Sequence, residues 1–278
     1  MLNFIKAVIY GIVEGITEWL PVSSTGHMIL LNELMPMEVS EEFWSMFVVV
    51  IQLGAIIAVI LYYWKTIWPV GVFQHRRRSY IGWRKEVLSL WGKIIAACIP
   101  AGVVGVLADD WLDEHLYNWQ VVSAMLILVG IAFLAVETLG RNREPRTSDV
   151  FDISLKEAVL IGLFQLIAAV FPGTSRSGAT IIGGLIIGVS RAAAADFTFI
   201  LAIPVMAGSS LLKLLKYDGS FTGTELMVLA TGMISALVVS LLVIRLLLGF
   251  IKNHDFKPFG IYRIILGILV IAYFAFLR

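Results

Sequence analysis

Two short polar stretches interrupt an otherwise apolar chain, and the first holds residue types that carry acid–base chemistry. Residues 14–27, "EGITEWLPVSSTGH", contain two carboxylates four positions apart, four hydroxyls, three of them consecutive, and a histidine. On a helix, Glu14 and Glu18 share one face about one turn apart. Near the centre of a bilayer each carboxylate would cost roughly 3 kcal/mol. Two of them together therefore require a cation, a shared proton or water.

The same stretch contains a predicted helix break. Pro21 is expected to end the first helical arm, and Ser23, Ser24 and Thr25 are expected to cap the next one. The free N–H groups at the start of that second arm favour an anion. His27 follows Ser24 by three residues, so the two side chains lie on one side of the arm. This pattern predicts an anion site with a titratable ring beside it.

The second polar stretch, "PGTSRSGAT" at residues 172–180, predicts another break at Pro172 and Gly173. Arg176 lies in its middle, and arginine is the side chain best shaped to grip a phosphate by two parallel hydrogen bonds. Together the two stretches suit a phosphate or pyrophosphate, with the acids serving either as ligands for a hard divalent cation or as a base. The hydroxyls of this second capping cluster belong to Thr174, Ser175 and Ser177.

Several other classes of site are disfavoured. Neither break contains a P-loop, H-E-x-x-H or G-x-S-x-G pattern, which argues against nucleotide hydrolysis and zinc proteolysis. Cys98 is the single cysteine, so an internal disulfide and a cysteine-based metal site are excluded. The net charge of +1 gives no indication of nucleic-acid binding, and none is expected.

The composition is that of an integral membrane protein. Of the residues, 59% are hydrophobic and only 15% are charged, whereas a soluble domain carries more charge. Several apolar stretches reach the roughly 20 residues needed to cross a bilayer. The chain is therefore predicted to be a polytopic, all-α protein embedded in lipid. Six full spans are predicted at about 43–64, 91–108, 120–138, 195–215, 226–249 and 260–278.

Two further apolar regions do not fit full spans. Residues 2–35 and 156–190 are each interrupted near the middle by Pro, Gly, Ser and charge, which leaves two arms too short to cross. Such broken backbone is tolerated at membrane depth only where protein or a water-filled cavity satisfies it. Both regions are predicted to be re-entrant helical hairpins.

The distribution of Lys and Arg predicts the orientation. The connections at 65–90 and 141–156 are basic, whereas the connection between them, "DDWLDEH" at 109–115, has no Lys or Arg. The basic connections are therefore expected to face the cytoplasm. Their basic residues are Lys65, Arg76, Arg77, Arg78, Arg84 and Lys85 in the first, and Arg141, Arg143, Arg146 and Lys156 in the second.

An internal repeat is indicated at an offset of 152 residues. "SSTG" from Ser23 aligns with "SRSG" from Ser175, and "FVVVIQLGA" from Phe47 aligns with "FILAIPVMA" from Phe199 without a gap. Upstream, Gly15 and Glu18 match Gly162 and Gln165 only if about five residues are inserted. Three spans separate the two hairpins, an odd number, so the halves must be inverted. The prediction is a single polytopic membrane domain, 1–278, with inverted-topology repeats at about 1–140 and 150–278.

Both motifs resemble the signature segments of the bacterial undecaprenyl pyrophosphate phosphatases, also called bacitracin-resistance proteins. "FVVVIQLGAIIAVI", "FTFILAIPVMAG" and the closing "KPFGIYRIILGILV" fall in the order that this family shows, so the resemblance runs along the whole chain. It implies a multi-pass enzyme of the bacterial inner membrane that hydrolyses undecaprenyl pyrophosphate to undecaprenyl phosphate. The implied site opens toward the periplasm and uses a divalent cation, Mg or Ca.

The resemblance also implies roles for individual residues. Glu14 and Glu18 are the expected metal ligands, and the expected pocket lining is Ser23, Thr25, Thr174, Ser175 and Ser177. Either Ser24 attacks the terminal phosphorus with His27 or Glu18 taking its proton, or the attacker is His27 or water; Ser24 with His27 is the favoured pairing. A homodimer is an open alternative to a monomer. The expected catalytic residues are Glu18, Ser24, His27 and Arg176.

Two other functions stay open on the sequence alone. A lipid phosphate phosphatase with a histidine nucleophile shares fragments of these motifs, but its Lys/Arg-Pro element is missing and no histidine follows Arg176 within ten residues. A transporter or flippase of the lipid carrier would fit the inverted repeat. Such a protein needs no hydrolysis, so phosphate release separates it from a phosphatase.

Overall fold

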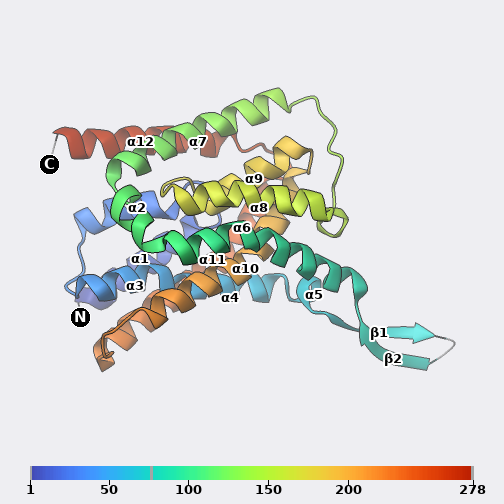
Figure 1. Cartoon of the computed structure of the whole chain (residues 1–278), viewed down its shortest axis with the longest axis horizontal. Coiled ribbons are helices and arrows are strands. Elements are labelled where there is room, and N and C mark those ends of the chain that lie inside the picture. The colour runs from blue at the N-terminus through green and yellow to red at the C-terminus, as the bar shows by residue number, and fades with distance from the viewer. Residues whose placement is uncertain (1, 76–77, 277–278) are drawn as a thin grey trace.

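Apolar helices make up almost the whole architecture (Figure 1). The computed structural model describes residues 2–75 and 78–276. In chain order the elements are α1 Leu2–Thr17, α2 Ser24–Leu34, α3 Glu41–Val50, α4 Gln52–Tyr62, α5 Trp64–Ile67, β1 Val70–His75, β2 Arg78–Trp83, α6 Lys85–Leu116, α7 Trp119–Leu139, a 3-10 turn Val150–Asp152, α8 Leu155–Val170, α9 Arg176–Ile187, α10 Arg191–Leu215, α11 Gly223–Phe250 and α12 Lys257–Phe276.

The predicted spans are confirmed. Within the described residues, six helical segments are long and apolar enough to cross a bilayer. The observed helices start earlier than the apolar windows because a helix continues to its cap: the Ser190 hydroxyl accepts from Ala193 N–H and starts α10, and Thr222 with Glu225 forms a capping box before α11. The six segments are Glu41–Tyr62, Lys85–Ala108, Trp119–Leu139, Arg191–Leu215, Gly223–Phe250 and Lys257–Phe276.

The two interrupted regions each form a helix, a break and a second helix. Helices α1 and α2 have 16 and 11 residues, and α8 and α9 have 16 and 12. None of these arms reaches the roughly 20 residues that a span requires. The first break covers residues 18–23 and the second covers 171–175. Both lie at the positions predicted from the polar stretches.

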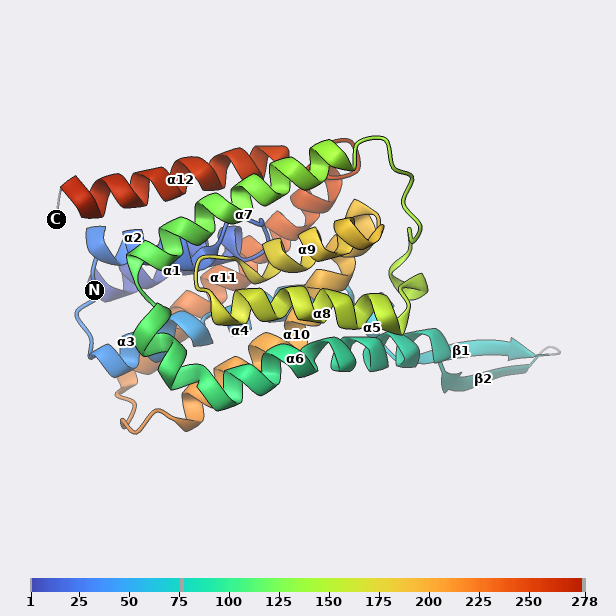
Figure 2. The ribbon, with the colours of Figure 1, turned by 45° about the horizontal axis from the view of Figure 1, so that its top comes forward.

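The connections gather at two ends of the molecule (Figure 2). One end carries the β1–β2 hairpin, the α7–α8 connection and the α11–α12 connection; the opposite end carries the α6–α7 and α10–α11 connections. The two predicted basic connections therefore share an end. Arg76 and Arg77 of the first connection lie outside the described residues. The antiparallel hairpin, with Val70 opposite Trp83, is a feature that the sequence reading had treated only as a connection.

Small residues allow the short arms to approach the long helices closely. A Cβ on Gly15 of α1 would lie 2.8 Å from the carbonyl oxygen of Ala236 in α11. A Cβ on Gly162 of α8 would lie 2.4 Å from the carbonyl oxygen of Ala97 in α6. Each first arm thus packs backbone to backbone against a spanning helix of the other half of the chain, as small residues permit in membranes.

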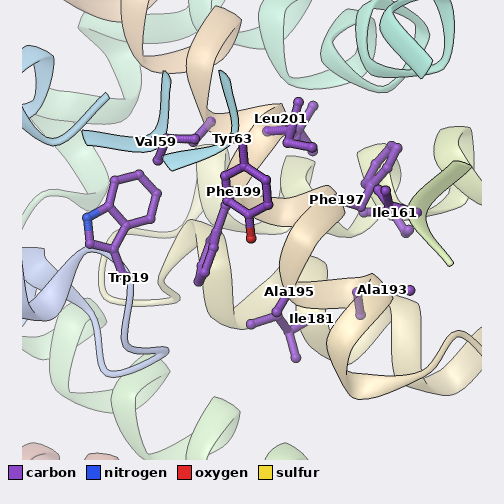
Figure 3. Packing of buried hydrophobic residues seen from close by; sticks show 14 of the residues in the cluster. Trp19, Val59, Tyr63, Ile161, Ile181, Ala193, Ala195, Phe197, Phe199 and Leu201 are labelled. Atoms are coloured by element: carbon purple, nitrogen blue, oxygen red, sulfur yellow. The ribbon is translucent and has the colours of Figure 1, made fainter. Parts of the chain in front are cut away.

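Buried aromatic side chains anchor the first break against α10. Trp19, in the first break, is fully buried and meets Phe199 of α10 edge to face with ring centroids 5.2 Å apart (Figure 3). Such aromatic pairs add about 1 kcal/mol beyond the area they bury. Helices α7 and α12 lie side by side along one edge of the molecule (Figures 1 and 2). The breaks are therefore enclosed between helices that come from both halves of the chain.

Candidate active site

Each break contains one serine in a strained backbone conformation. Ser23 has φ 73° and ψ 103°, and Ser175 has φ 70° and ψ 120°. Among the described residues these are the only ones besides glycine with a positive φ. Such a conformation costs on the order of 1–3 kcal/mol and persists where the surrounding structure imposes it, commonly at functional sites. The two serines are also the pair aligned by the internal repeat.

The two breaks start their second arms differently. Ser175 caps α9, because its hydroxyl accepts from Gly178 N–H at 3.2 Å. The corresponding Ser23 makes no cap bond, and its buried hydroxyl oxygen has no partner in the described structure. The expected capping of α2 by Ser23 is therefore wrong. The hydroxyl of Ser24 donates to the Glu18 carboxylate instead. The N–H groups in the first turn of α2 therefore have no side-chain cap and can bind an anion.

A charged network joins the breaks across 158 positions of sequence. Arg176 Nη2 donates to Glu18 Oε1 at 2.9 Å, and both side chains are almost buried. Ser24 Oγ donates to the other oxygen, Glu18 Oε2, at 3.1 Å. Ser177 Oγ donates to the backbone carbonyl of Glu18 at 3.0 Å. Glu18 is thus the centre at which residues of both motifs meet.

Arg176 is held from two further directions. Its Nη1 donates to the carbonyl oxygen of Thr198 in α10 at 2.9 Å. Its guanidinium lies 6.0 Å from the centroid of the Trp19 ring, at the outer limit of a cation–π contact. Its Nε is buried without a hydrogen-bond partner in the described structure. The side chain is fixed in place and still has a donor to offer.

Glu14 lies one turn before Glu18 and is the second acid of the site. The backbone N–H of Glu18 donates to the carbonyl of Glu14 at 3.0 Å, so the helical geometry continues between them. Glu14 is 1% exposed, and its Oε1 has no hydrogen-bond partner in the described structure. The charges of Glu18 and Arg176 both act on it. A buried carboxylate with an unused oxygen beside a second carboxylate fits a hard cation or a proton.

A cation at this position would be bound mainly by groups other than protein acids. No cluster of three or more His, Cys, Asp or Glu side chains occurs within the described residues. Magnesium is typically held by one or two carboxylates together with substrate phosphates and water. Glu14 and Glu18, with the hydroxyls of the first break, match that donor set in kind.

Both ring nitrogens of His27 lie beside groups other than Ser24. Its Nδ1 lies 2.7 Å from the carbonyl oxygen of Ser23, and its Nε2 lies 2.7 Å from the hydroxyl of Tyr262 in α12. A carbonyl can only accept, so we assign the proton to Nδ1 and the acceptor role to Nε2. The expected pairing of Ser24 with His27 is therefore not what the structure shows. The backbone contact of His27 rotates its ring toward α12, and Glu18 takes its place beside Ser24.

The chain is similar over most of its length to a known protein family. The family model described as "Bacitracin resistance protein BacA" matches residues 7–269. This chain belongs to the BacA family.

Curated relatives agree with this assignment. The "Undecaprenyl-diphosphatase" of Desulfitobacterium hafniense is 54% identical over 275 residues, 99% of this chain and 97% of that protein. The "Undecaprenyl-diphosphatase 1" of Clostridium acetobutylicum is 55% identical over 273 residues, 98% of each chain. The "Undecaprenyl-diphosphatase" of Enterococcus faecalis is 52% identical over 270 residues, 97% of this chain and 96% of that protein.

The remaining predicted residues of the BacA site lie on or beside the two breaks. Thr174 is buried and donates to the carbonyl of Phe171 at 2.7 Å, which shapes the second break. The hydroxyls of Ser175 and Ser177 are 3.2 Å apart. Thr25 is half-buried in the first turn of α2. Thr174 therefore supports the loop, and the hydroxyls of the second arm bond to each other and to Glu18.

Two residues of α12 contact the candidate site although neither motif contains them. Arg263 is fully buried and contacts both breaks, and Tyr262 contacts His27. A signal for Arg263 existed in the sequence, because a charged residue within an apolar span is a candidate functional residue in the same way as Arg176. For Tyr262 no comparable signal existed, since a tyrosine near the end of a span is commonly an interfacial anchor.

Proposed function

We propose that this protein is an integral membrane phosphatase that hydrolyses undecaprenyl pyrophosphate to undecaprenyl phosphate and inorganic phosphate, and so recycles the lipid carrier for cell-wall synthesis. The observation that carries this proposal is the network in which Arg176 and Ser24, from different breaks, both bond Glu18. The names of the relatives and the six candidate spans support a membrane-embedded diphosphatase.

The network suggests how substrate binding prepares the reaction. In the structure the Arg176 guanidinium is paired with Glu18 through one hydrogen bond. A pyrophosphate offers Arg176 a more highly charged acceptor with bidentate geometry. When Arg176 moves its hydrogen bond to the phosphate, Glu18 Oε2 stays beside the Ser24 hydroxyl and can accept its proton.

Hydrolysis then follows in two steps. Ser24 Oγ forms a bond to the terminal phosphorus as the bridging P–O bond breaks, its proton passes to Glu18, and undecaprenyl phosphate leaves. The oxygen of a water molecule then bonds to phosphorus as the Ser24 Oγ–P bond breaks, Glu18 returns its proton to Ser24, and inorganic phosphate leaves with both protons of that water. Arg176 and the uncapped N–H groups of α2 neutralise charge that develops on the phosphoryl oxygens. Attack by water with Ser24 as a phosphate ligand, or by His27, uses the same pocket without this phosphoserine.

Glu14 and Glu18 are the proposed ligands of a divalent cation, Mg or Ca. The support is the unused, buried Oε1 of Glu14 next to a second carboxylate. When bound, such an ion supplies positive charge to the phosphate oxygens. The role of Glu14 itself is to hold this charge beside Glu18 without competing for the Ser24 proton.

The two helix–break–helix units are proposed to be re-entrant hairpins related by an inverted repeat of about 1–140 and 150–278. The matching backbone of Ser23 and Ser175 and the matching close packing of Gly15 and Gly162 support this symmetry. The basic connections lie together at one end of the molecule (Figure 2), which supports a cytoplasmic position for that end and a periplasmic entrance for the first hairpin. A homodimer stays a prediction, tested by the mass of the purified protein in detergent.

The test is release of inorganic phosphate from undecaprenyl pyrophosphate by the purified, detergent-solubilised protein, compared with the Ser24→Ala variant. A phosphatase releases phosphate, and a transporter or flippase of the lipid carrier does not. Absence of phosphate release from correctly folded protein over a range of Mg and Ca concentrations would contradict the proposed function.

A further inference from the structure

Helix α12 contains neither polar motif, yet one of its residues binds both breaks. Arg263 lies inside a membrane span and is 0% exposed. Its Nη1 donates to the carbonyl oxygen of Pro21 in the first break at 3.2 Å. Its Nη2 donates to the carbonyl oxygens of Gly173 and Thr174 in the second break at 2.7 and 2.9 Å. A single guanidinium thus connects the two loops that carry the site residues.

This arrangement has a physical reason. A helix break leaves backbone carbonyls without helical partners, and at membrane depth each needs a donor. Arg263 supplies donors in two directions from one rigid plane, which a lysine ammonium on a flexible stem does not reproduce. None of the ion pairs in the described part of the chain involves Arg263. Its charge is therefore compensated by carbonyl dipoles of the breaks.

Tyr262, the residue before Arg263 in α12, contacts His27. The Tyr262 hydroxyl lies 2.7 Å from His27 Nε2, and the two rings are stacked at 5.7 Å with planes 5° apart. Together with the Ser23 carbonyl at Nδ1, this contact fixes both nitrogens of the imidazole. The ring orientation of His27 is thus determined from α12 and from the first break at once.

We propose that Tyr262 and Arg263 are positioning residues of the phosphatase site: Arg263 sets the distance between the two breaks, and Tyr262 orients His27. This inference rests on the proposed function, because the positioned groups are Glu18, Ser24 and His27 in and directly after the first break and Arg176 directly after the second. Their contacts depend on the separation of the two loops. A displacement of about 1 Å in a reacting geometry can cost roughly 100-fold in rate.

The main experiment compares Arg263→Lys and Arg263→Met with the matched control Arg245→Lys. Arg245 also lies in a spanning helix, α11, but its side chain is exposed. The expected result is a kcat for both Arg263 variants at least roughly 30-fold below wild type with KM changed by less than about threefold, since positioning acts on the reacting geometry more than on binding. Arg245→Lys should retain wild-type kinetics. Thermal unfolding of each purified variant reports whether it is folded.

The second arm replaces Tyr262 with Phe, and Tyr273→Phe on the same helix is the control. The change removes one hydroxyl and leaves the stacked ring, so folding should be retained. We expect kcat to fall roughly 3- to 10-fold and the shape of its pH profile to change, because the imidazole loses the bond that fixes Nε2. Tyr273→Phe should match wild type in both respects.

The outcomes separate this inference from the proposed function. If the wild-type protein releases no phosphate, the function itself is wrong. If the wild type is active and folded Arg263→Lys has wild-type kcat, the charge alone suffices and the positioning role of Arg263 is wrong. If neither Arg263 variant folds, Tyr262→Phe decides: wild-type kcat and pH profile would overturn the inference, and the predicted changes would support it.

Discussion

Two arginine–glutamate pairs in the described part of the chain join segments that are distant in sequence, and they differ in how many of their donors and acceptors have partners. In the first, Arg191 at the start of α10 donates from Nε to Glu137 Oε1 at 2.9 Å and from Nη2 to Oε2 at 2.5 Å. The backbone N–H of Phe256, just before α12, donates to the same carboxylate at 3.0 Å. Both carboxylate oxygens of Glu137 accept hydrogen bonds from protein donors. This pair therefore links α7, α10 and the α11–α12 connection.

The second pair, Arg176 with Glu18, is joined by one hydrogen bond and surrounded by unused groups. Arg176 Nε, Glu14 Oε1 and Ser23 Oγ are all buried without partners in the described structure. Buried polar groups are normally satisfied, and exceptions call for an explanation. The comparison teaches that residue type and burial do not distinguish a structural pair from a reactive one. A reactive pair is distinguished by the buried donors and acceptors around it that have no hydrogen-bond partner.

The largest expected effect separates the two arginines. Arg176→Lys should lower phosphate release roughly 100-fold or more, because one ammonium cannot supply the bidentate fork to the pyrophosphate in the transition state. The matched variant Arg191→Lys should keep activity within about threefold, since Arg191 bonds only the remote Glu137 carboxylate. Near-normal turnover by Arg176→Lys would remove Arg176 from the centre of the site. The measurement is the initial rate of each folded, purified variant.

The next effect concerns the nucleophile. Ser24→Ala should lower kcat roughly 100-fold, since the hydroxyl that donates to Glu18 is lost. Wild-type enzyme quenched early with substrate labelled in the terminal phosphate should carry label that is stable in acid, as expected of phosphoserine. Label that is acid-labile, alkali-stable and absent in His27→Ala would assign the attack to His27. No label at any time, with appreciable turnover by Ser24→Ala, would favour water.

A smaller effect is expected at the unused carboxylate oxygen. Chelation should abolish activity and added Mg or Ca should restore it if Glu14 and Glu18 bind a cation. Glu14→Gln should then raise the cation concentration for half-maximal activity roughly tenfold, because the site loses one ligand charge. Full activity in excess chelator would leave the two acids as proton carriers. Activity titrated against each cation, for wild type and variant in parallel, provides the measurement.

The smallest effect on activity is expected at the saturated pair. Glu137→Gln should leave kcat within about twofold and lower the free energy of unfolding by about 1–2 kcal/mol, because several charge-assisted bonds are weakened where Arg191 is partly exposed to solvent. Thermal unfolding and phosphate release, measured on the same preparation, test both parts. A large loss of activity at unchanged stability would show that the Arg191–Glu137 pair takes part in catalysis, which contradicts its proposed structural role.

Much of this architecture could be read from local sequence. The six spans follow from runs of apolar residues, since crossing a bilayer needs a fixed length of apolar helix. The breaks follow from Pro21 and from Pro172 with Gly173 because clusters of hydroxyl and charged residues surround them. Proline alone does not predict a break, since Pro100 and Pro204 lie within the continuous helices α6 and α10. The predicted ends of the spans were less accurate. In α10, for example, the Ser190 cap starts the helix before the apolar stretch begins.

The sequence by itself therefore determined the spans, the two breaks and the residue types that a phosphate site needs, because hydrophobic length, helix interruption and side-chain chemistry are properties of short segments. Only the tertiary structure decided which of these groups meet: Glu18 beside Ser24, His27 turned to Tyr262, and Arg263 between the breaks. These partners lie up to 242 positions apart. Their pairing depends on how α12 packs with α7 and with the two breaks, and no local pattern encodes that packing.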